Sequence, residues 1–188
     1  MGFFTALLLN ITRQTMLLSN PPRLILIAGL PGTGKSTVAR ALVEHYGGLH
    51  INSDLLRNAL NMRGHYRPDD KEKVYQEMLE RSRLGLLNGQ SVVVDSTFIR
   101  ENVRTPFEAV AQSCGVPFFW VEMLANEDSI RQRLEKPRAD SEADFSVFLA
   151  LRAQNEPLQT PHLALWSDKM SLEDLVKSIY DYTLQASL

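Results

Sequence analysis

The chain of 188 residues contains a single cysteine, Cys114, which has no internal partner for a disulfide. It also lacks the paired Cys and His spacing of a structural zinc site. Both absences favour a reducing compartment, and we expect the protein in the cytoplasm. Charge of one sign is not in excess either, because 20 Lys and Arg stand against 22 Asp and Glu. This balance disfavours a protein that binds nucleic acid through its overall charge.

Apolar runs long enough to span a bilayer are also lacking. The most apolar terminal stretch, residues 3–9, is short and has neither the basic start nor the cleavage site of a secretory signal. It is interpreted as a ragged start or a surface helix, with a peripheral anchor as the alternative. We expect residues 1–22 to form an N-terminal extension and residues 23–188 to form one domain, without a membrane span.

From Arg23 onward, short apolar runs alternate with longer amphipathic stretches, a pattern typical of a parallel sheet covered by helices. Five runs predict strands, at residues 24–28, 49–52, 91–95, 117–123 and 163–166. Helical periodicity predicts helices at residues 35–46, 54–61, 70–87, 100–113, 127–135, 144–154 and 172–184. The sequence therefore predicts an α/β fold, a three-layer sandwich around a five-stranded parallel sheet.

The first predicted strand is followed by a glycine-rich loop that fits the phosphate-binding pattern GxxxxGK[ST]. Glycines permit the backbone angles that turn successive N–H groups inward, and the next helix points its positive end at the same anion. We expect Lys35 to bridge the β- and γ-phosphates of ATP and the Ser36 hydroxyl to ligate Mg²⁺. The expected nucleotide-binding residues are Gly29, Leu30, Pro31, Gly32, Thr33, Gly34, Lys35, Ser36 and Thr37.

The second predicted strand ends beside Asp54, with Arg57 three residues later on the same helix face. The carboxyl edge of a doubly wound sheet is where ligands bind. A carboxylate and a guanidinium there suit a hydroxyl acceptor, with Asp54 orienting the hydroxyl and taking its proton while Arg57 neutralises phosphoryl charge or holds the acceptor. The competing interpretation is that Asp54 is simply the N-cap of the following helix.

The third predicted strand is an apolar β-branched run that ends in Asp95. This is the signature of a Walker B strand lying beside the phosphate-loop strand. We expect Asp95 to hold the hydration shell of Mg²⁺ or to contact the acceptor. A helix cap is again the alternative role, although Ser96 or Thr97 would serve there as well.

A cationic stretch with a helix breaker follows the fourth predicted strand. Cations at the end of one helix, interrupted by Pro137 and resumed near Asp144, predict a short lid at about residues 136–144 that closes over a triphosphate. Arg138 is the candidate for stabilising transition-state charge. Arg133, one turn earlier, is expected to stack on adenine or contact the α-phosphate.

The order of these motifs resembles the small P-loop kinases that include polynucleotide 5′-hydroxyl kinases, zeta toxins and chloramphenicol phosphotransferase. Their strand, GxPGxGKS loop and later Asp-x-x-Arg are matched by residues 29–36 with Asp54 and Arg57. Further matches are Tyr75, Asp95, Arg104, Arg133-Leu134, Arg138 and Glu156-Pro157. The resemblance implies a sheet of order 2-3-1-4-5, ATP with Mg²⁺, and phosphorylation of a hydroxyl.

The sequence therefore favours an ATP-dependent phosphotransferase whose acceptor is a hydroxyl of a small molecule. A kinase acting on a 5′-hydroxyl polynucleotide or a tRNA is the alternative, because the sequence around Arg63, His65 and Arg67 is cationic and aromatic and could stack a base or bind a phosphate. The same stretch is equally interpreted as a solvent-exposed loop that caps the sheet. A nucleotide-hydrolysing switch is the alternative of another class. The guanine-reading Asn-Lys-x-Asp of many switches is lacking, since residues 167–170 read Ser-Asp-Lys-Met.

Overall fold

One parallel sheet forms the centre of the computed structural model, which describes residues 21–65, 67–136 and 143–185. Its strands are β1 (Leu24–Ala28), β2 (Leu49–Asn52), β3 (Val92–Ser96), β4 (Phe118–Leu124) and β5 (His162–Trp166). They are ordered β2-β3-β1-β4-β5. Both the parallel sheet and its order are confirmed, and β1, which leads into the phosphate loop, lies at the centre between β3 and β4.

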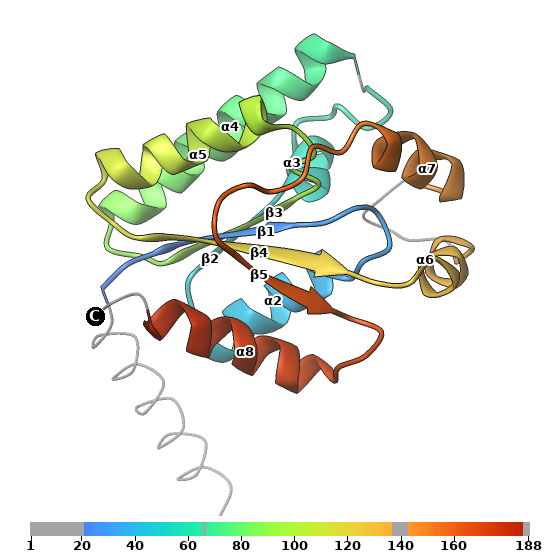
Figure 1. The fold of residues 1–188 in the computed structure, drawn as a ribbon. Coiled ribbons are helices and arrows are strands. Elements are labelled where there is room, and N and C mark those ends of the chain that lie inside the picture. The colour runs from blue at the N-terminus through green and yellow to red at the C-terminus, as the bar shows by residue number, and fades with distance from the viewer. Residues whose placement is uncertain (1–20, 66, 137–142, 186–188) are drawn as a thin grey trace, which may run out of the picture.

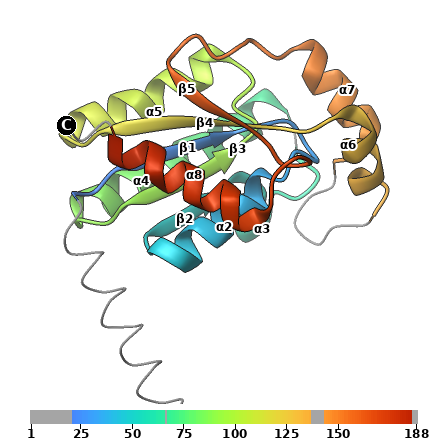
Figure 2. The same ribbon diagram turned by 60° about the horizontal axis from the view of Figure 1, so that its bottom comes forward.

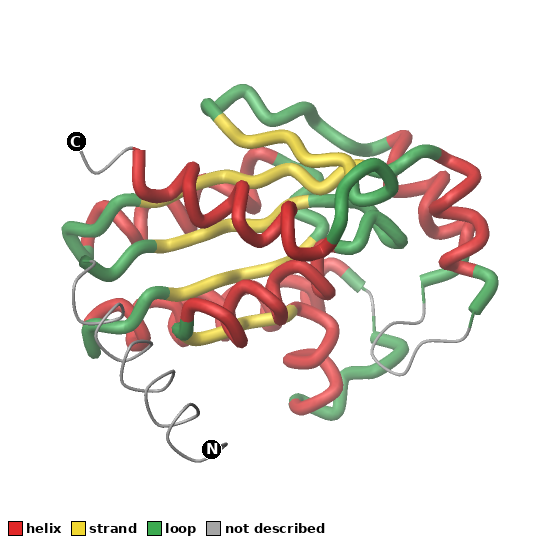
Figure 3. The backbone as a smooth tube through the Cα atoms, turned by 90° about the horizontal axis from the view of Figure 1, so that it is seen from below, coloured by secondary structure: helices red, strands yellow, loops and turns green. Residues whose placement is uncertain are grey.

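Helices cover both faces of the sheet and complete the predicted three layers (Figure 1). On one face lie α3 (Ser53–Ala59), α4 (Pro68–Leu87) and α5 (Glu101–Ser113). The opposite face carries α2 (Lys35–Tyr46) and α8 (Leu172–Gln185), which come forward in Figure 2 and lie in front of the strands in Figure 3. The short helices α6 (Glu127–Leu134) and α7 (Phe145–Ala153) lie beyond the carboxyl end of β4. In the described part of the chain, no helix is long and apolar enough to cross a membrane.

The two faces of the sheet bury separate hydrophobic cores. Because side chains alternate along a strand, Leu24 and Leu26 of β1 face α4 and α5 while Ile25 and Ile27 face α2 and α8. All four are almost fully buried. Burial on both sides explains why this strand is a continuous apolar run.

Two helices begin earlier than the periodicity predicts. The α3 helix starts at Ser53 because the Asn52 side chain caps it, accepting a hydrogen bond from the Leu55 amide at 2.7 Å. The α4 helix starts at Pro68, since proline has a helical φ angle and no N–H to leave unsatisfied in the first turn. The predicted N-terminal extension up to residue 20, Arg138 and most of the predicted lid lie outside the described residues.

Candidate active site

The phosphate loop turns tightly between β1 and α2. Gly32 and Gly34 have φ angles of +83° and +87°, a left-handed conformation that favours glycine. A Cβ on Gly29 would lie 2.8 Å from the carbonyl oxygen of Met123, so only glycine fits where the loop passes β4. The Thr33 hydroxyl donates to the Leu30 carbonyl at 2.8 Å and closes the turn. The glycines of the pattern are therefore required by the shape of the loop.

The α2 helix begins directly at the end of this loop. Gly34 is its N-cap residue, and the first helical hydrogen bond runs from the Val38 amide to the Gly34 carbonyl at 3.1 Å. The unsatisfied amides and the positive end of the helix dipole therefore point at the loop. Lys35 and Ser36 are half-buried there, whereas Thr37 is exposed. This arrangement fits a polyphosphate held by backbone amides.

Asp95 lies at the carboxyl end of β3, fully buried, and accepts hydrogen bonds from three side chains. The Ser36 hydroxyl donates to Oδ2 at 2.6 Å, and the Asn52 amide donates to the same oxygen at 2.8 Å. The His50 Nε2 donates to Oδ1 at 2.5 Å. These bonds fix the carboxylate beside the first turn of α2.

The pair of Ser36 and Asp95 fits a Mg²⁺ site of the P-loop kind. The Ser36 hydroxyl has one proton and two lone pairs, so it can donate to Asp95 while a lone pair ligates a cation. The donor set is all oxygen, which Mg²⁺ prefers. Mg²⁺ held there would neutralise charge on the β- and γ-phosphates of ATP.

Asp54 is not the N-cap of α3. The cap of α3 is Asn52, and Asp54 is a half-buried residue of the first helical turn. Because the Asn52 amide also donates to the Ser36 hydroxyl at 3.1 Å, the start of α3 lies beside the phosphate loop. Asp54 is therefore carried to the edge of the sheet where the loop lies, with its carboxylate not used to cap α3.

Arg57 is 7% exposed and braces the connection between α3 and α4. Its Nη1 donates to the backbone carbonyl of His65 at 2.5 Å. Nearby, the Tyr75 hydroxyl lies 3.1 Å from the Ser96 hydroxyl at the end of β3. Burial raises the pKa of Tyr75, and the charges of Arg57 and Asp54 act on it in opposite directions. Asp54, Arg57 and Tyr75 thus share one environment, and the catalytic role of Arg57 stays a prediction.

Arg133 comes from α6 and joins the phosphate loop to the segment after β5. Its Nη1 donates to the Gly32 carbonyl at 3.0 Å and to the Ser167 hydroxyl at 2.8 Å. Its Nη2 donates to the Ser167 carbonyl at 3.2 Å. The guanidinium therefore links the phosphate loop to the segment after β5. Its expected contact with adenine or the α-phosphate stays a prediction.

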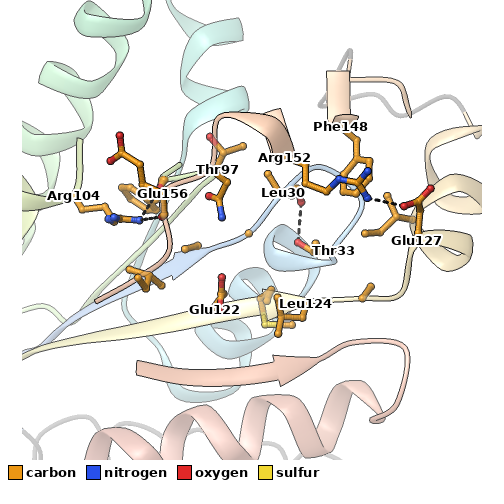
Figure 4. Close-up of a pocket in the computed structure, with 18 residues that line it drawn as sticks. Leu30, Thr33, Thr97, Arg104, Glu122, Leu124, Glu127, Phe148, Arg152 and Glu156 are labelled. Carbon is orange, nitrogen blue, oxygen red and sulfur yellow. Dashed lines mark hydrogen bonds and ion pairs between the residues drawn. The ribbon is translucent and has the colours of Figure 1, made fainter. Parts of the chain in front are cut away.

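A pocket of about 210 Å³ adjoins the first half of the phosphate loop (Figure 4). It lies between the carboxyl ends of the central strands and the helices α5 and α7. Its lining includes Leu30 of the loop, Thr97 after β3, Arg104 of α5, Glu122 of β4 and Phe148 of α7.

Comparison with known proteins identifies the family. A family described as an AAA domain matches residues 24–158, which contain the loop and every strand except β5. The chain belongs to this AAA-domain family. An uncharacterized protein of Mycobacterium bovis is 30% identical over 153 residues, and the chain spans 31% of its length. A UPF0200 protein of Aeropyrum pernix is 29% identical over 84% of this chain and 91% of that protein.

Solved structures with the same fold include kinases. The APS kinase of Mycobacterium tuberculosis, in complex with AMPPNP and APS, has a TM-score of 0.66 and 20% identity over 86% of this chain and 96% of its own. A gluconokinase of Sinorhizobium meliloti has a TM-score of 0.66 and 21% identity over 84% and 89%. A Chloroflexus aurantiacus protein has a TM-score of 0.72 and 16% identity over 90% and 100%. The fold of this AAA-domain chain is therefore that of P-loop kinases, as the resemblance implied.

Several site residues of this AAA-domain protein are missed by the motif pattern. His50 and Asn52 are two residues apart on β2 and therefore lie on the same face of the sheet, where both reach Asp95 of the neighbouring strand. Glu122 lies in β4 among buried apolar neighbours. The signal that would have found them is a polar residue inside an otherwise apolar strand. Ser167 has no such signal, because its role depends on where Arg133 lies.

Proposed function

We propose that this chain is an ATP-dependent kinase that transfers the γ-phosphoryl group to a hydroxyl of a small molecule. The observation that carries the proposal is the placement of Asp54. It lies in the first turn of a helix whose cap, Asn52, hydrogen bonds to Ser36 and Asp95. A carboxylate beside the phosphate loop and not used to cap its helix suits a general base better than a structural role.

The residues divide the reaction between them. Amides of the loop would hold the β-phosphate, and Lys35 would follow the γ-phosphate as it moves. Ser36 and Asp95 would hold Mg²⁺ directly or through its water shell. The acceptor oxygen forms a bond to the γ-phosphorus, the bond from that phosphorus to the bridging oxygen of ADP breaks, and the acceptor proton passes to Asp54. Arg57 and Arg138 are proposed to neutralise phosphoryl charge.

The rate of phosphate transfer to an alcohol, compared with the rate of ATP hydrolysis, distinguishes a kinase from a nucleotide-hydrolysing switch. The purified chain, given ATP labelled in the γ-phosphate, should label an alcohol added from a mixed panel much faster than it releases free phosphate. The panel includes sugars, nucleosides and 5′-hydroxyl oligonucleotides, so the polynucleotide alternative is tested in the same assay. Release of phosphate alone, at a rate unaffected by every alcohol, would contradict the kinase.

A further inference from the structure

The pocket beside the phosphate loop contains a carboxylate, that of Glu122, to which no described residue donates a hydrogen bond. Glu122 of β4 pairs in register with Ala28, the last residue of β1 before the loop. Figure 4 shows its side chain rising from β4 into the cavity. The side chain is 26% exposed, and no hydrogen bond to its carboxylate is found in residues 21–65, 67–136 and 143–185. Its ion-pair contact there is His162, with Nε2 3.6 Å from Oε2.

His162 does not satisfy this carboxylate in its neutral form. Its Nδ1 lies 2.9 Å from the carbonyl oxygen of Thr160, which only accepts, so the ring proton sits on Nδ1. The Nε2 of the neutral ring then presents a lone pair toward Glu122, and 3.6 Å is beyond hydrogen-bond distance. With this neutral ring, no donor of the described residues hydrogen bonds to the Glu122 carboxylate, which is left open to a donor on a molecule in the pocket.

Among the described residues, two cations line the pocket, and both already have partners. Arg104, 5% exposed, donates to the carbonyls of Glu156 at 2.7 Å and of Phe98 and Pro157 at 3.3 Å. Arg152 at the rim is paired with Glu127 at 2.6 Å. Turning either guanidinium toward a new ligand would leave carbonyls or a carboxylate without a partner. Among the described residues, by contrast, no hydrogen-bond donor reaches Glu122, so its carboxylate is open to a bound cation.

Size and position fit a small acceptor. A pocket of about 210 Å³ is below the roughly 300–1,000 Å³ of sites that hold drug-sized ligands. Its lining shares Gly29, Leu30 and Thr33 with the phosphate loop. Thr97 extends the lining to the end of β3, two residues after Asp95. A molecule in the pocket would thus lie against the loop on which ATP is proposed to bind.

We propose that this pocket is the acceptor site and that Glu122 selects a small hydroxyl compound bearing an ammonium group, an amino alcohol or amino sugar. The proposal rests on the kinase function proposed above. The Glu122 carboxylate accepts hydrogen bonds from the ammonium group, and a hydroxyl of the same molecule is phosphorylated. An anionic acceptor is disfavoured, because it would place a second negative charge beside a carboxylate that has no hydrogen-bond donor among the described residues.

The test uses acceptors matched in size but different in charge. Three sets serve: ethanolamine, ethylene glycol and glycolate; serinol, glycerol and glycerate; glucosamine, glucose and gluconate. Transfer from γ-labelled ATP is measured for the full chain and for Glu122→Gln, which removes the charge and keeps the shape. Glu77→Gln removes the same charge from the exposed surface of α4 and serves as the control.

In any set that is phosphorylated, we expect the amine to exceed the neutral alcohol in kcat/KM by about tenfold to a hundredfold, the worth of a charged hydrogen bond. Glu122→Gln should remove this preference and leave AMPPNP binding unchanged, while Glu77→Gln keeps the preference. Equal use of amine and alcohol, preference for the acid, or an unchanged preference in Glu122→Gln would overturn the acceptor class but not the kinase. Binding of AMPPNP without transfer to any compound would overturn the proposed function itself.

Discussion

The Nε2 of His50 lies 2.5 Å from Oδ1 of Asp95, across the pairing of β2 and β3. The opposite oxygen of the same carboxylate accepts from Ser36 and Asn52. Because Asp95 is fully buried, its orientation depends on these donors rather than on water. His50 therefore helps to fix the rotation of the Asp95 carboxylate, and with it the geometry of the proposed Mg²⁺ site.

His50→Ala should raise the Mg²⁺ concentration needed for half-maximal transfer. It removes one of three donors, and a buried acceptor left without its partner costs about 1–3 kcal/mol. A magnesium titration of the transfer rate, with a melting curve for each variant, measures both effects. His50→Gln, whose amide can still donate, should recover part of the loss. His45→Ala, on the exposed side of α2, is the control. An unchanged titration in His50→Ala would remove His50 from the support of Asp95.

Lys35→Ala should abolish transfer while weakening nucleotide binding less than it slows turnover. The lysine charge is proposed to follow the γ-phosphate as it moves, so its contribution is larger in the transition state than in the ground state. Single-turnover rates and AMPPNP titration separate the two quantities. A near-normal rate would contradict the assignment of residues 29–37 as the phosphate cradle.

The fold and the phosphate loop were predictable because they depend on local sequence. Apolar runs placed the strands to within a residue or two, and the spacing of the loop glycines is required by φ angles such as +83° at Gly32. The observed ends of elements differ from the predicted ones where a single side chain determines the boundary. At α3, the Asn52 side chain caps the helix, so the helix begins one residue earlier than predicted. Because Asn52 is the N-cap, Asp54 lies inside the first turn of α3 and does not cap the helix.

Contacts between distant segments were not predictable in the same way. The contacts of Arg133 with Gly32 and Ser167 join residues 101 and 34 positions apart in sequence, and its place in a cationic stretch did not indicate them. Its contact with the nucleotide stays a prediction. Glu122 and His50 appear in the sequence as lone polar residues inside strands. Their significance depends on which strands are neighbours, and the order of the sheet comes from packing rather than from periodicity.

Arg133→Ala should lower the affinity for ATP, because the phosphate loop loses the hydrogen bond that Arg133 donates to the Gly32 carbonyl. Three hydrogen bonds to Gly32 and Ser167 are lost, and bonds from a charged donor are worth more than neutral ones. Titration with AMPPNP and a melting curve measure the two consequences. If Arg133 instead acts by contacting nucleotide alone, affinity falls with no change in the melting temperature of the free protein.

Arg138→Ala should lower turnover by roughly a hundredfold or more and leave ATP affinity within a few fold, since a lid arginine meets the phosphoryl group mainly in the closed state. Steady-state rates and AMPPNP titration on the same preparation measure this difference. Arg131→Ala supplies a control, because that exposed cation pairs with Glu127 on its own helix. Parallel loss of rate and affinity in Arg138→Ala would make Arg138 a nucleotide-binding residue instead.

Asp54→Asn should separate a kinase from a nucleotide binder. The cap of α3 is Asn52, so the substitution leaves the hydrogen bond to Leu55 in place and the melting temperature should be preserved. AMPPNP binding should also persist, because the cradle is formed by residues 29–37. Transfer to an alcohol should nevertheless fall by on the order of a hundredfold to ten-thousandfold, the usual contribution of a positioned base. Slow hydrolysis of ATP to water would continue.

The comparison that completes this test is Asn52→Ala, which removes the cap of α3 and the amide donor to Asp95 together. It should lower the melting temperature, since loss of an N-cap costs about 0.5–2 kcal/mol. Asp54→Asn should lose activity without that loss of stability. If Asp54→Asn retains full transfer, or loses activity only in proportion to stability as Asn52→Ala does, Asp54 is not the base. Asp95 would not replace it easily, because three donors already occupy its carboxylate.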